Sequence, residues 1–290
     1  YAPVAVGALV EVNGAAQADG SINATRIEVK QGASASAGNY LSLRQPAVSV
    51  SAASYERETS GSSIVAAFGA NLATTTAQAR TIPLPTTLGG VSVLVDGVPT
   101  GLFFVSPTQI NYALPNGAQA GAAAATVMRG SEVVTQGLID IAEVAPSLFT
   151  ADATGRGVPA GSALRVKANG QVSYEPLARF DAAMNKIVPA TVQRNGDRVF
   201  LILYGAGFRT AANSDGNAAN GVAENVTVMI GGVNAPVLFA GAAPGFEGLD
   251  QINIEIPVQV VAGQNINVVI QARNRAGRLA SANLVQVAIQ

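Results

Sequence analysis

The chain has 290 residues, of which 49% are hydrophobic and only 12% are charged, and its formal net charge is −1. It contains no cysteine and no histidine, so disulfides, thiolate chemistry, most transition-metal sites and every histidine-based triad are excluded. Lysine occurs only at Lys30, Lys167 and Lys186, which gives no basic stripe for phosphates and argues against nucleic acid as a partner.

Residues 1–30 predict an N-terminal β-hairpin. Alternating segments flank Asp19-Gly20, a pair that tolerates the positive φ angles of tight turns. The segment 31–46 is rich in small residues and is interpreted as a linker. No apolar run reaches the ~18 to 20 residues of a membrane span, and the first residues lack the layout of a signal peptide. We interpret the chain as a mature, already processed protein.

From residue 47 onward, short stretches with period two recur between Gly, Pro, Asn and Asp, as in 91–95 and 284–289. This pattern predicts an all-β protein. About seven such strands per hundred residues favour sandwiches over a barrel. We therefore predict two tandem immunoglobulin-like β-sandwiches, 47–148 and 149–290, preceded by the β-hairpin.

An internal repeat indicates that one unit was duplicated. Three pairs of segments correspond in order and spacing: Ile64-Val-Ala-Ala-Phe-Gly69 with Phe200-Leu-Ile-Leu-Tyr-Gly205, Val91-Ser-Val-Leu-Val95 with Val226-Thr-Val-Met-Ile230, and Gln109-Ile-Asn-Tyr-Ala-Leu-Pro115 with Gln251-Ile-Asn-Ile-Glu-Ile-Pro257. The two Gln-Ile-Asn segments are expected in equivalent strands. The second copy has an extra loop of about seven residues that includes 241–248, an insertion of the kind that loops tolerate.

The Gln-Ile-Asn segments alternate apolar and amide side chains, which predicts strands with one buried face. We interpret the amides of Gln109, Asn111, Gln251 and Asn253 as groups that satisfy backbone atoms at a strand edge, with a ligand groove as the alternative. The aromatic residues at the repeat motifs are interpreted as core rather than as a sugar-binding platform: Phe103, Phe104, Phe149, Tyr204 and Phe239.

Several of these motifs resemble a known family. Ser51-Ala-Ala-Ser-Tyr55, Phe68-Gly-Ala-Asn-Leu72, Pro85-Thr-Thr-Leu-Gly-Gly90, Ala145-Pro-Ser-Leu-Phe149 and both Gln-Ile-Asn segments are similar, in the same order, to the Solibacter-type C-terminal domain of secreted acidobacterial proteins. The resemblance covers roughly residues 46–290 and implies immunoglobulin-like IPT modules, export and a non-catalytic role. The N-terminal hairpin resembles the end of a small domain of unknown function in exported bacterial proteins.

Candidate sites for chemistry are few. The segment 213–224 offers oxygen ligands, so Asp215, Asn217 and Glu224 form a weak calcium candidate; an ordinary Asn/Asp/Gly turn is the favoured interpretation. Glu175, Asp181 and Lys186 lack catalytic spacing and are interpreted as solvated charges. The sequence thus predicts no catalytic residue, no cofactor site and no enzymatic activity.

Two function classes remain. The favoured one is an extracellular structural protein that pairs strands with copies of itself and forms a filament, because a lone hairpin is marginal in water. Its expected assembly residues are Val10, Val12, Ile22, Ile27 and Val29. The alternative is a monomeric cell-surface module that binds a glycan or a protein through loops such as 70–88 and 209–224.

Overall fold

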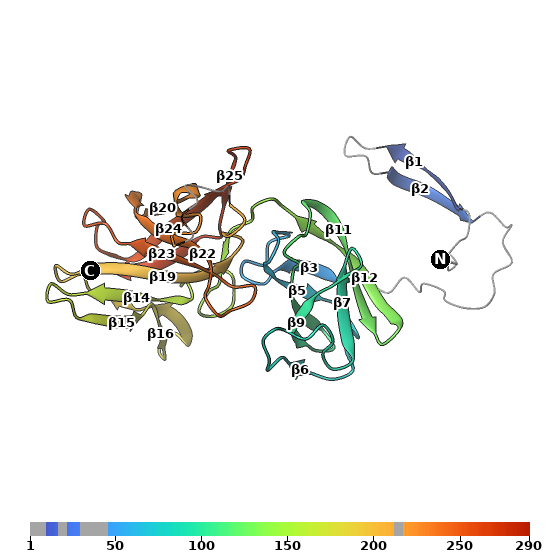
Figure 1. Ribbon diagram of the computed structural model, residues 1–290, viewed down its shortest axis with the longest axis horizontal. Helices are drawn as coiled ribbons and strands as arrows, with labels where there is room; N and C mark the ends of the chain where they lie inside the picture. Colours follow the sequence, from blue (N-terminus) through green and yellow to red (C-terminus); the bar gives the residue numbers. More distant parts are fainter. Residues whose placement is uncertain (1–9, 17–21, 30–45, 212–216, 218) are drawn as a thin grey trace. The chain divides into compact units, whose positions relative to one another are not determined.

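A computed structural model describes residues 10–16, 22–29, 46–211, 217 and 219–290. The chain divides into two compact units, 1–46 and 47–290 (Figure 1). Most of the predicted linker 31–46 and the Asp19-Gly20 turn lie outside the described residues. The all-β class is confirmed: the described part of the chain contains strands and one 3-10 turn, η1 (Ala223–Asn225), but no α-helix.

The first unit contains one antiparallel hairpin. Strand β1 (Val10–Ala16) pairs with β2 (Ile22–Val29), and a β-bulge shifts the register between Asn13 and Gly14. The predicted N-terminal hairpin is therefore present over these residues.

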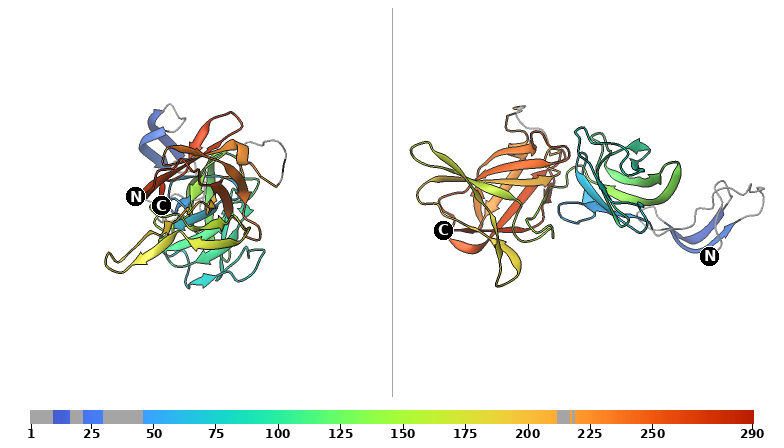
Figure 2. Two further views of the ribbon diagram at one scale, coloured as in Figure 1. Left: turned by 90° about the vertical axis from the view of Figure 1, so that its left-hand side faces the viewer. Right: turned by 90° about the horizontal axis from the view of Figure 1, so that it is seen from below.

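The segment 47–141 folds into two facing five-stranded sheets (Figures 1 and 2). Its strands are β3 (Val48–Ser51), β4 (Glu58–Thr59), β5 (Ile64–Phe68), β6 (Ala77–Gln78), β7 (Val91–Val95), β8 (Val98–Pro99), β9 (Gly101–Val105), β10 (Gln109–Ala113), β11 (Gly121–Arg129) and β12 (Glu132–Ile141). The strand orders are β3-β5-β10-β9-β6 and β4-β12-β11-β7-β8, antiparallel except for the β4–β12 pair.

The second segment, 144–289, repeats this plan with two six-stranded sheets and a separate hairpin. Its strands are β13 (Ser147–Leu148), β14 (Gly161–Val166), β15 (Val172–Pro176), β16 (Ala178–Asp181), β17 (Lys186–Pro189), β18 (Thr191–Val192), β19 (Arg198–Ala206), β20 (Val226–Ile230), β21 (Val233–Ala235), β22 (Val237–Ala242), β23 (Asp250–Glu255), β24 (Gly263–Arg273), β25 (Leu279–Ser281) and β26 (Val285–Ile289). The first sheet runs β15-β14-β19-β23-β22, with β13 as its sixth strand paired to β19, and the second runs β18-β26-β24-β20-β21, with β25 paired to β24. Strands β16 and β17 form the separate hairpin.

Each segment buries its own apolar core between its two sheets, which is consistent with two β-sandwiches. The first core includes Val65, Val93, Leu102, Ile110, Tyr112, Val127 and Ile139. The second includes Leu148, Leu201, Leu203, Phe208, Val228, Ile252, Ile254 and Val268. Ile141 belongs to the first core and Val144 to the second. The predicted domain boundary between residues 148 and 149 stays a prediction.

The two Gln-Ile-Asn segments occupy equivalent strands, as the repeat predicts. Strand β10 lies between β5 and β9, and β23 lies between β19 and β22. The register is also the same: Gln109 lies opposite Phe68, and Gln251 lies opposite Tyr204. In each copy the aromatic residue of an aromatic–glycine pair, Phe68-Gly69 or Tyr204-Gly205, therefore lies opposite the first amide residue.

Of the two glycines in these aromatic–glycine pairs, Gly69 and Gly205, backbone packing requires Gly205. At Gly205 a Cβ would lie 2.1 Å from the carbonyl oxygen of Ser147, because β13 pairs with β19 there. At Gly69 a Cβ would instead meet the Cδ2 atom of Leu72 at 2.8 Å, the end of a flexible side chain.

We therefore expect Gly205→Ala to destabilise the protein by about 3 kcal/mol and Gly69→Ala by about 1 kcal/mol or less. Urea unfolding of both variants measures the difference. Gly117→Ala is the control, because nothing lies within 4 Å of a Cβ there and its φ is not in the left-handed region. Equal losses at Gly69 and Gly205 would contradict this account of the repeat.

Tyr112 provides a pH test of the first core. It is fully buried on β10, its hydroxyl donates to Ser49 Oγ at 3.2 Å, and burial raises its pKa to about 12, with the Ser49 hydrogen bond opposing the rise. Because the folded-state pKa lies above the unfolded value of about 10, the stability from this group is complete below about pH 10. That stability is lost as the pH rises through about 12, by about 3 kcal/mol in all.

Tyr112→Phe should remove this part of the alkaline loss while costing about 1 kcal/mol at neutral pH through the lost hydrogen bond. The measurement is urea unfolding at neutral pH and at about pH 11, between the two pKa values. Tyr174→Phe, at an exposed tyrosine, is the matched control. A Tyr112→Phe protein with the parent's alkaline dependence would show that this hydroxyl does not carry it.

Candidate functional surfaces

The hairpin β1–β2 places the five expected assembly residues on one register face. Val10 pairs with Val29, Val12 with Ile27, and Ala16 with Ile22. The bulge leaves Thr25 without an opposite residue, which brings Ile22 into phase with Ile27 and Val29. The other register face carries Glu11, Asn13, Asn23, Arg26 and Glu28. One set of register positions in this hairpin is therefore mostly apolar in sequence and the other mostly polar.

The calcium candidate lies partly outside the described residues, because Asp215 falls in 212–216. Asn217 Oδ1 accepts a hydrogen bond from Ala219 N at 3.0 Å, and Glu224 lies in η1. Among the described residues, no group of three Asp or Glu side chains is arranged to hold a metal ion. The calcium site stays a prediction.

Glu175, Asp181 and Lys186 do not converge. Glu175 belongs to β15 and forms a bidentate pair with Arg165, with Nε–Oε1 2.5 Å and Nη2–Oε2 3.0 Å. Arg165 is buried and also donates to Asp197 Oδ2 at 3.2 Å, and its hydrogen bond with Glu175 raises its pKa. The interpretation of Glu175 as a solvated charge was wrong, because this carboxylate neutralises a buried guanidinium.

Asp181 and Lys186 lie opposite each other at the end of the β16–β17 hairpin. Asp181 Oδ1 accepts from Met184 N at 3.1 Å and Ala183 N at 3.0 Å, and the hydrogen bond from Met184 N lowers its pKa. This carboxylate closes a turn in the way that Asp commonly does.

The repeated amides form one hydrogen-bonded pair on each sandwich. Gln109 Nε2 donates to Asn111 Oδ1 at 2.8 Å, and Gln251 Nε2 donates to Asn253 Oδ1 at 2.9 Å. All four side chains are half-buried and lie on the outward face of their sheet, since the intervening Ile110 and Ile252 are in the core. The interpretation that these amides cap backbone atoms at a strand edge was wrong: β10 and β23 are central strands.

Aromatic side chains flank both amide pairs. In the first sandwich Phe68 of β5 lies opposite Gln109, and Phe104 of β9 lies opposite Asn111. In the second, Tyr204 of β19 lies opposite Gln251, and Phe239 of β22 lies opposite Asn253.

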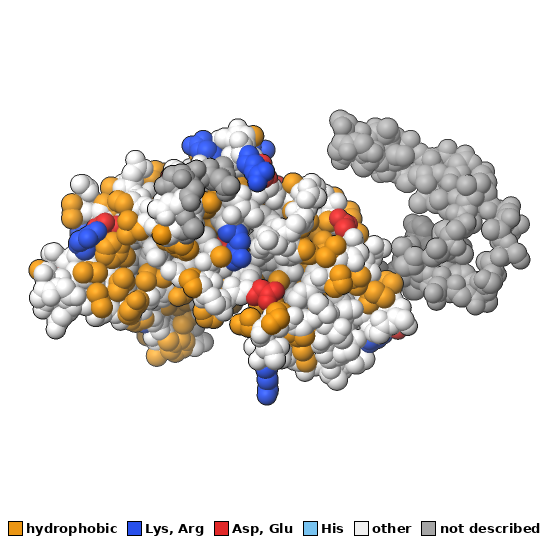
Figure 3. Space-filling model, in the orientation of Figure 1, with side chains coloured by type: hydrophobic (Ala, Val, Ile, Leu, Met, Phe, Trp, Pro, Cys, Tyr) orange, Lys and Arg blue, Asp and Glu red, His pale blue; other side chains and the backbone are white. Residues whose placement is uncertain are grey.

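The sequence interpretation of five aromatic residues as core was wrong. They are only half-buried and belong to neither core cluster: Phe103, Phe104, Phe149, Tyr204 and Phe239. On the face drawn in Figure 3, hydrophobic side chains cover much of both sandwiches and charged side chains are sparse. Aromatic residues placed on a surface are typical of binding faces.

The loop inserted in the second copy contacts the first sandwich. Glu247 Oε2 accepts a hydrogen bond from Leu84 N at 3.2 Å. At Gly248, where φ is +72°, a Cβ would lie 2.8 Å from Ile64 Cγ1. The inserted loop therefore packs against β5 and the segment before β7, and a larger residue at 248 does not fit.

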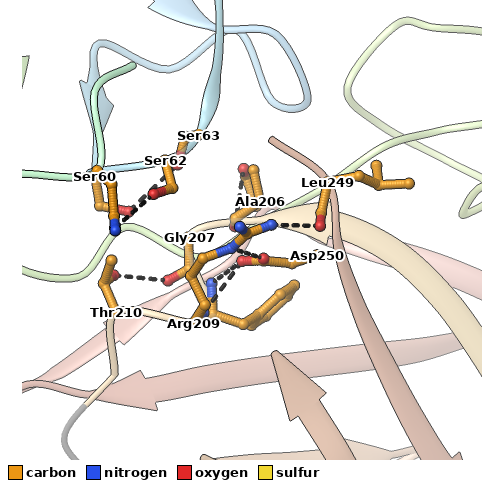
Figure 4. A network of polar contacts seen from close by, with 12 residues as sticks. Ser60, Ser62, Ser63, Ala206, Gly207, Arg209, Thr210, Leu249 and Asp250 are labelled. Atoms are coloured by element: carbon orange, nitrogen blue, oxygen red, sulfur yellow. Dashed lines mark hydrogen bonds and ion pairs between the residues drawn. The ribbon is translucent and has the colours of Figure 1, made fainter. Parts of the chain in front are cut away.

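A polar network lies beside this loop (Figure 4). Asp250 is buried and forms an ion pair with Arg209 Nε, and its Oδ2 accepts from Phe208 N at 2.7 Å and Arg209 N at 3.1 Å. Burial raises the pKa of Asp250, and Arg209 opposes that rise. The first copy has Ala73 and Thr108 at the corresponding positions, so it lacks this ion pair.

A polar cleft of about 620 Å³ lies between loops of the two sandwiches and is lined in part by Glu56, Arg57, Arg278 and Asn283. Asn283 is committed to the fold, because its amide bonds both the N–H and the C=O of Leu148, at 2.7 and 2.9 Å. The cleft thus includes structural amides as well as exposed charges.

Comparison with known proteins finds no matching family model and no matching curated protein. The chain has a distant structural likeness to a Bacteroides ovatus surface glycan-binding protein, SGBP-B of a mixed-linkage glucan utilization locus, in complex with a mixed-linkage heptasaccharide: identity 12%, TM-score 0.35, coverage 80% of this chain and 44% of that one. An auxiliary nutrient binding protein from Bacteroides ovatus gives 12%, 0.23, 82% and 59%, and the extracellular region of plexin A4 gives 13%, 0.22, 94% and 21%.

The chain thus spans about half the length of the two Bacteroides proteins that it matches. The resemblance to the Solibacter-type family is not matched by a family model, and what the comparisons support is a distant likeness to bacterial surface binding proteins and plexin β domains. No helix in the described part of the chain has the length and apolar character to cross a membrane.

Proposed function

We propose that the chain is a non-enzymatic extracellular surface protein that assembles with copies of itself through strand pairing by the hairpin β1–β2. The observation that carries the proposal is the register of this hairpin, which keeps Val10, Val12, Ile22, Ile27 and Val29 on one face across the bulge. A two-stranded hairpin with an apolar face is marginally stable in water and gains stability when a third strand or a sheet covers it.

The hairpin of one copy would add to a sheet edge of the next copy. One of the two six-stranded sheets ends at β15, where Val172 is 62% exposed and Tyr174 is 68% exposed, while the alternate residues Ser173 and Glu175 are half-buried. An edge strand with exposed apolar side chains is a template for β-augmentation. Because the donor and acceptor surfaces differ, the contact is heterologous and propagates as a filament unless the rotation closes a ring.

Deletion of residues 1–30 should abolish assembly and leave 47–290 folded, since both cores lie in the second unit. Val10→Asp with Val12→Asp should have the same effect, because two charges on the apolar register face oppose docking. The measurements are negative-stain electron microscopy and sedimentation of the concentrated protein.

The matched control is Asn13→Asp with Ala15→Asp, which adds the same two charges to the opposite register face and should leave assembly intact. If the deleted protein polymerises like the full chain, or if the full chain stays monomeric, strand donation by this segment is wrong.

The acceptor edge has a separate test. Val172→Lys with Tyr174→Lys should reduce polymer length or raise the concentration required for assembly by about tenfold, because charged side chains block edge pairing. Phe180→Lys, at a 60% exposed residue of β16, controls for charge placed elsewhere on the same sandwich. Equal behaviour of the two variants in sedimentation would exclude β15 as the acceptor.

A second candidate function is a surface module that binds a glycan. The specific observation in its favour is that amide pairs with adjoining aromatic side chains lie on the outward face at the same register positions of both sandwiches. The mixed-linkage heptasaccharide bound by the Bacteroides ovatus protein is a suitable first ligand for calorimetry. Binding by a protein that stays monomeric would favour this candidate over assembly.

A further inference from the structure

Two exposed aromatic rings lie together on the outward face of the first sandwich. Tyr55 is 40% exposed and Phe68 is 36% exposed, and their ring centroids are 6.3 Å apart with the planes tilted by 38°. This spacing is within the range of favourable aromatic pairs. The pair therefore presents apolar ring surface to solvent instead of burying it in the core.

Tyr55 is held in this place at a conformational cost. Its φ angle is +62°, a left-handed conformation that is a genuine outlier for a bulky side chain. Three contacts impose it: Tyr55 N donates to Ser51 O at 2.9 Å, Ser51 N donates to Glu56 O at 2.9 Å, and the Tyr55 hydroxyl donates to Ala153 O at 2.9 Å. The fold thus fixes an exposed ring at a strained position, which is common at binding sites.

The amide pair lies beside these rings. Gln109 is directly opposite Phe68 on the neighbouring strand, and Asn111 follows two residues later on the same face. Their mutual hydrogen bond uses Gln109 Nε2 and Asn111 Oδ1, so the carbonyl oxygen of Gln109 and the NH2 group of Asn111 keep hydrogen-bonding capacity for a ligand. One acceptor and one donor thus adjoin two apolar rings.

We infer that Tyr55, Phe68, Gln109 and Asn111, here called the Tyr55–Phe68 platform, bind a neutral sugar unit of a polysaccharide. The C–H face of a pyranose packs on an aromatic ring, and its hydroxyl groups both donate and accept hydrogen bonds, which matches rings beside paired amides. The platform is built from two rings and two amides and includes no Lys, Arg, Asp or Glu, so it suits a neutral sugar. The inference deepens the second candidate function and does not depend on assembly.

The second sandwich carries a related surface that serves as an internal comparison. Tyr204 replaces Phe68, and Gln251 and Asn253 form the equivalent amide pair. Tyr204 is half-buried, and within the described residues the one close pair of aromatic rings is Tyr55–Phe68. The first sandwich is therefore expected to bind more strongly.

The test is native affinity electrophoresis of the full chain in gels that contain soluble mixed-linkage β-glucan, hydroxyethylcellulose or xylan, with calorimetry on cellohexaose and xylohexaose. Tyr55→Asn removes one ring and keeps a residue that tolerates φ near +60°. Phe68→Leu removes the other ring and keeps an apolar side chain on the strand. Each variant should bind about tenfold more weakly than the parent, which corresponds to one lost aromatic contact.

Phe180→Leu is the matched control, since it removes an exposed ring from the other sandwich and should bind like the parent. Thermal unfolding checks that all variants fold, and Gln109→Leu with Asn111→Thr provides a third variant that keeps both rings. The inference is overturned if the parent binds none of these neutral glycans, or if the ring variants bind as tightly as Phe180→Leu. Electron microscopy of the same variants shows whether assembly is retained, so failure of sugar binding and failure of assembly are distinguishable.

Discussion

Both sandwiches depend on one constraint, the pairing of a central strand with the neighbouring strand that carries an aromatic residue opposite its first amide. These pairs are β10 with β5 and β23 with β19. In β10 and β23 every second residue must enter a core, so the intervening residues are forced onto the outward face. A one-residue slip would bury the amides Gln109 and Asn111 and expose Ile110 and Tyr112. The core therefore fixes the positions of the outward amides and of the aromatic residues opposite them.

The same constraint explains which features could be predicted from the sequence. Alternation and the duplicated segments are local signals, and they correctly predict the all-β class and the equivalence of the Gln-Ile-Asn strands. The exposure of the aromatic residues could not be predicted in this way. The register between β9 and β10 shifts at a bulge, where Asn111 lies opposite Phe104 but Tyr112 lies opposite Leu102. Phe103 therefore has no opposite residue, and both Phe103 and Phe104 are half-buried. Bulges break the alternation on which the core assignment depended.

The hairpin gives a second example of a bulge that changes the outcome. Strict alternation along β2 would place Ile22 on the face opposite to Ile27 and Val29, because 22 is an even residue number and 27 and 29 are odd. The shift between Asn13 and Gly14 restores the phase, so the five residues proposed for assembly share one register face. Glycine at position 14 suits a bulge, but the sequence alone does not indicate which strand takes the extra residue.

Charge is scarce in this protein, and the structure uses part of it internally. Arg165 is buried and pairs with the half-buried Glu175 and Asp197, and Asp250 is buried and pairs with the half-buried Arg209. Buried pairs of this kind contribute little net stability relative to apolar packing, but removal of one partner leaves a costly uncompensated charge. Sequence spacing could not identify them, since Arg165 and Asp197 meet only through the long-range pairing of β14 with β19.

Charged side chains are few on the outward faces, which also carry amides, hydroxyls and aromatic rings. A surface of this composition has weak long-range repulsion between copies and weak affinity for any single neutral ligand. Assembly would strengthen the weak ligand binding, because identical low-affinity sites repeated along one polymer bind a long polysaccharide with high avidity. The two proposals are therefore compatible so long as strand donation leaves the Tyr55–Phe68 platform uncovered. If assembly buried the platform, the sugar and the neighbouring subunit would compete, and added polysaccharide would shorten the filaments.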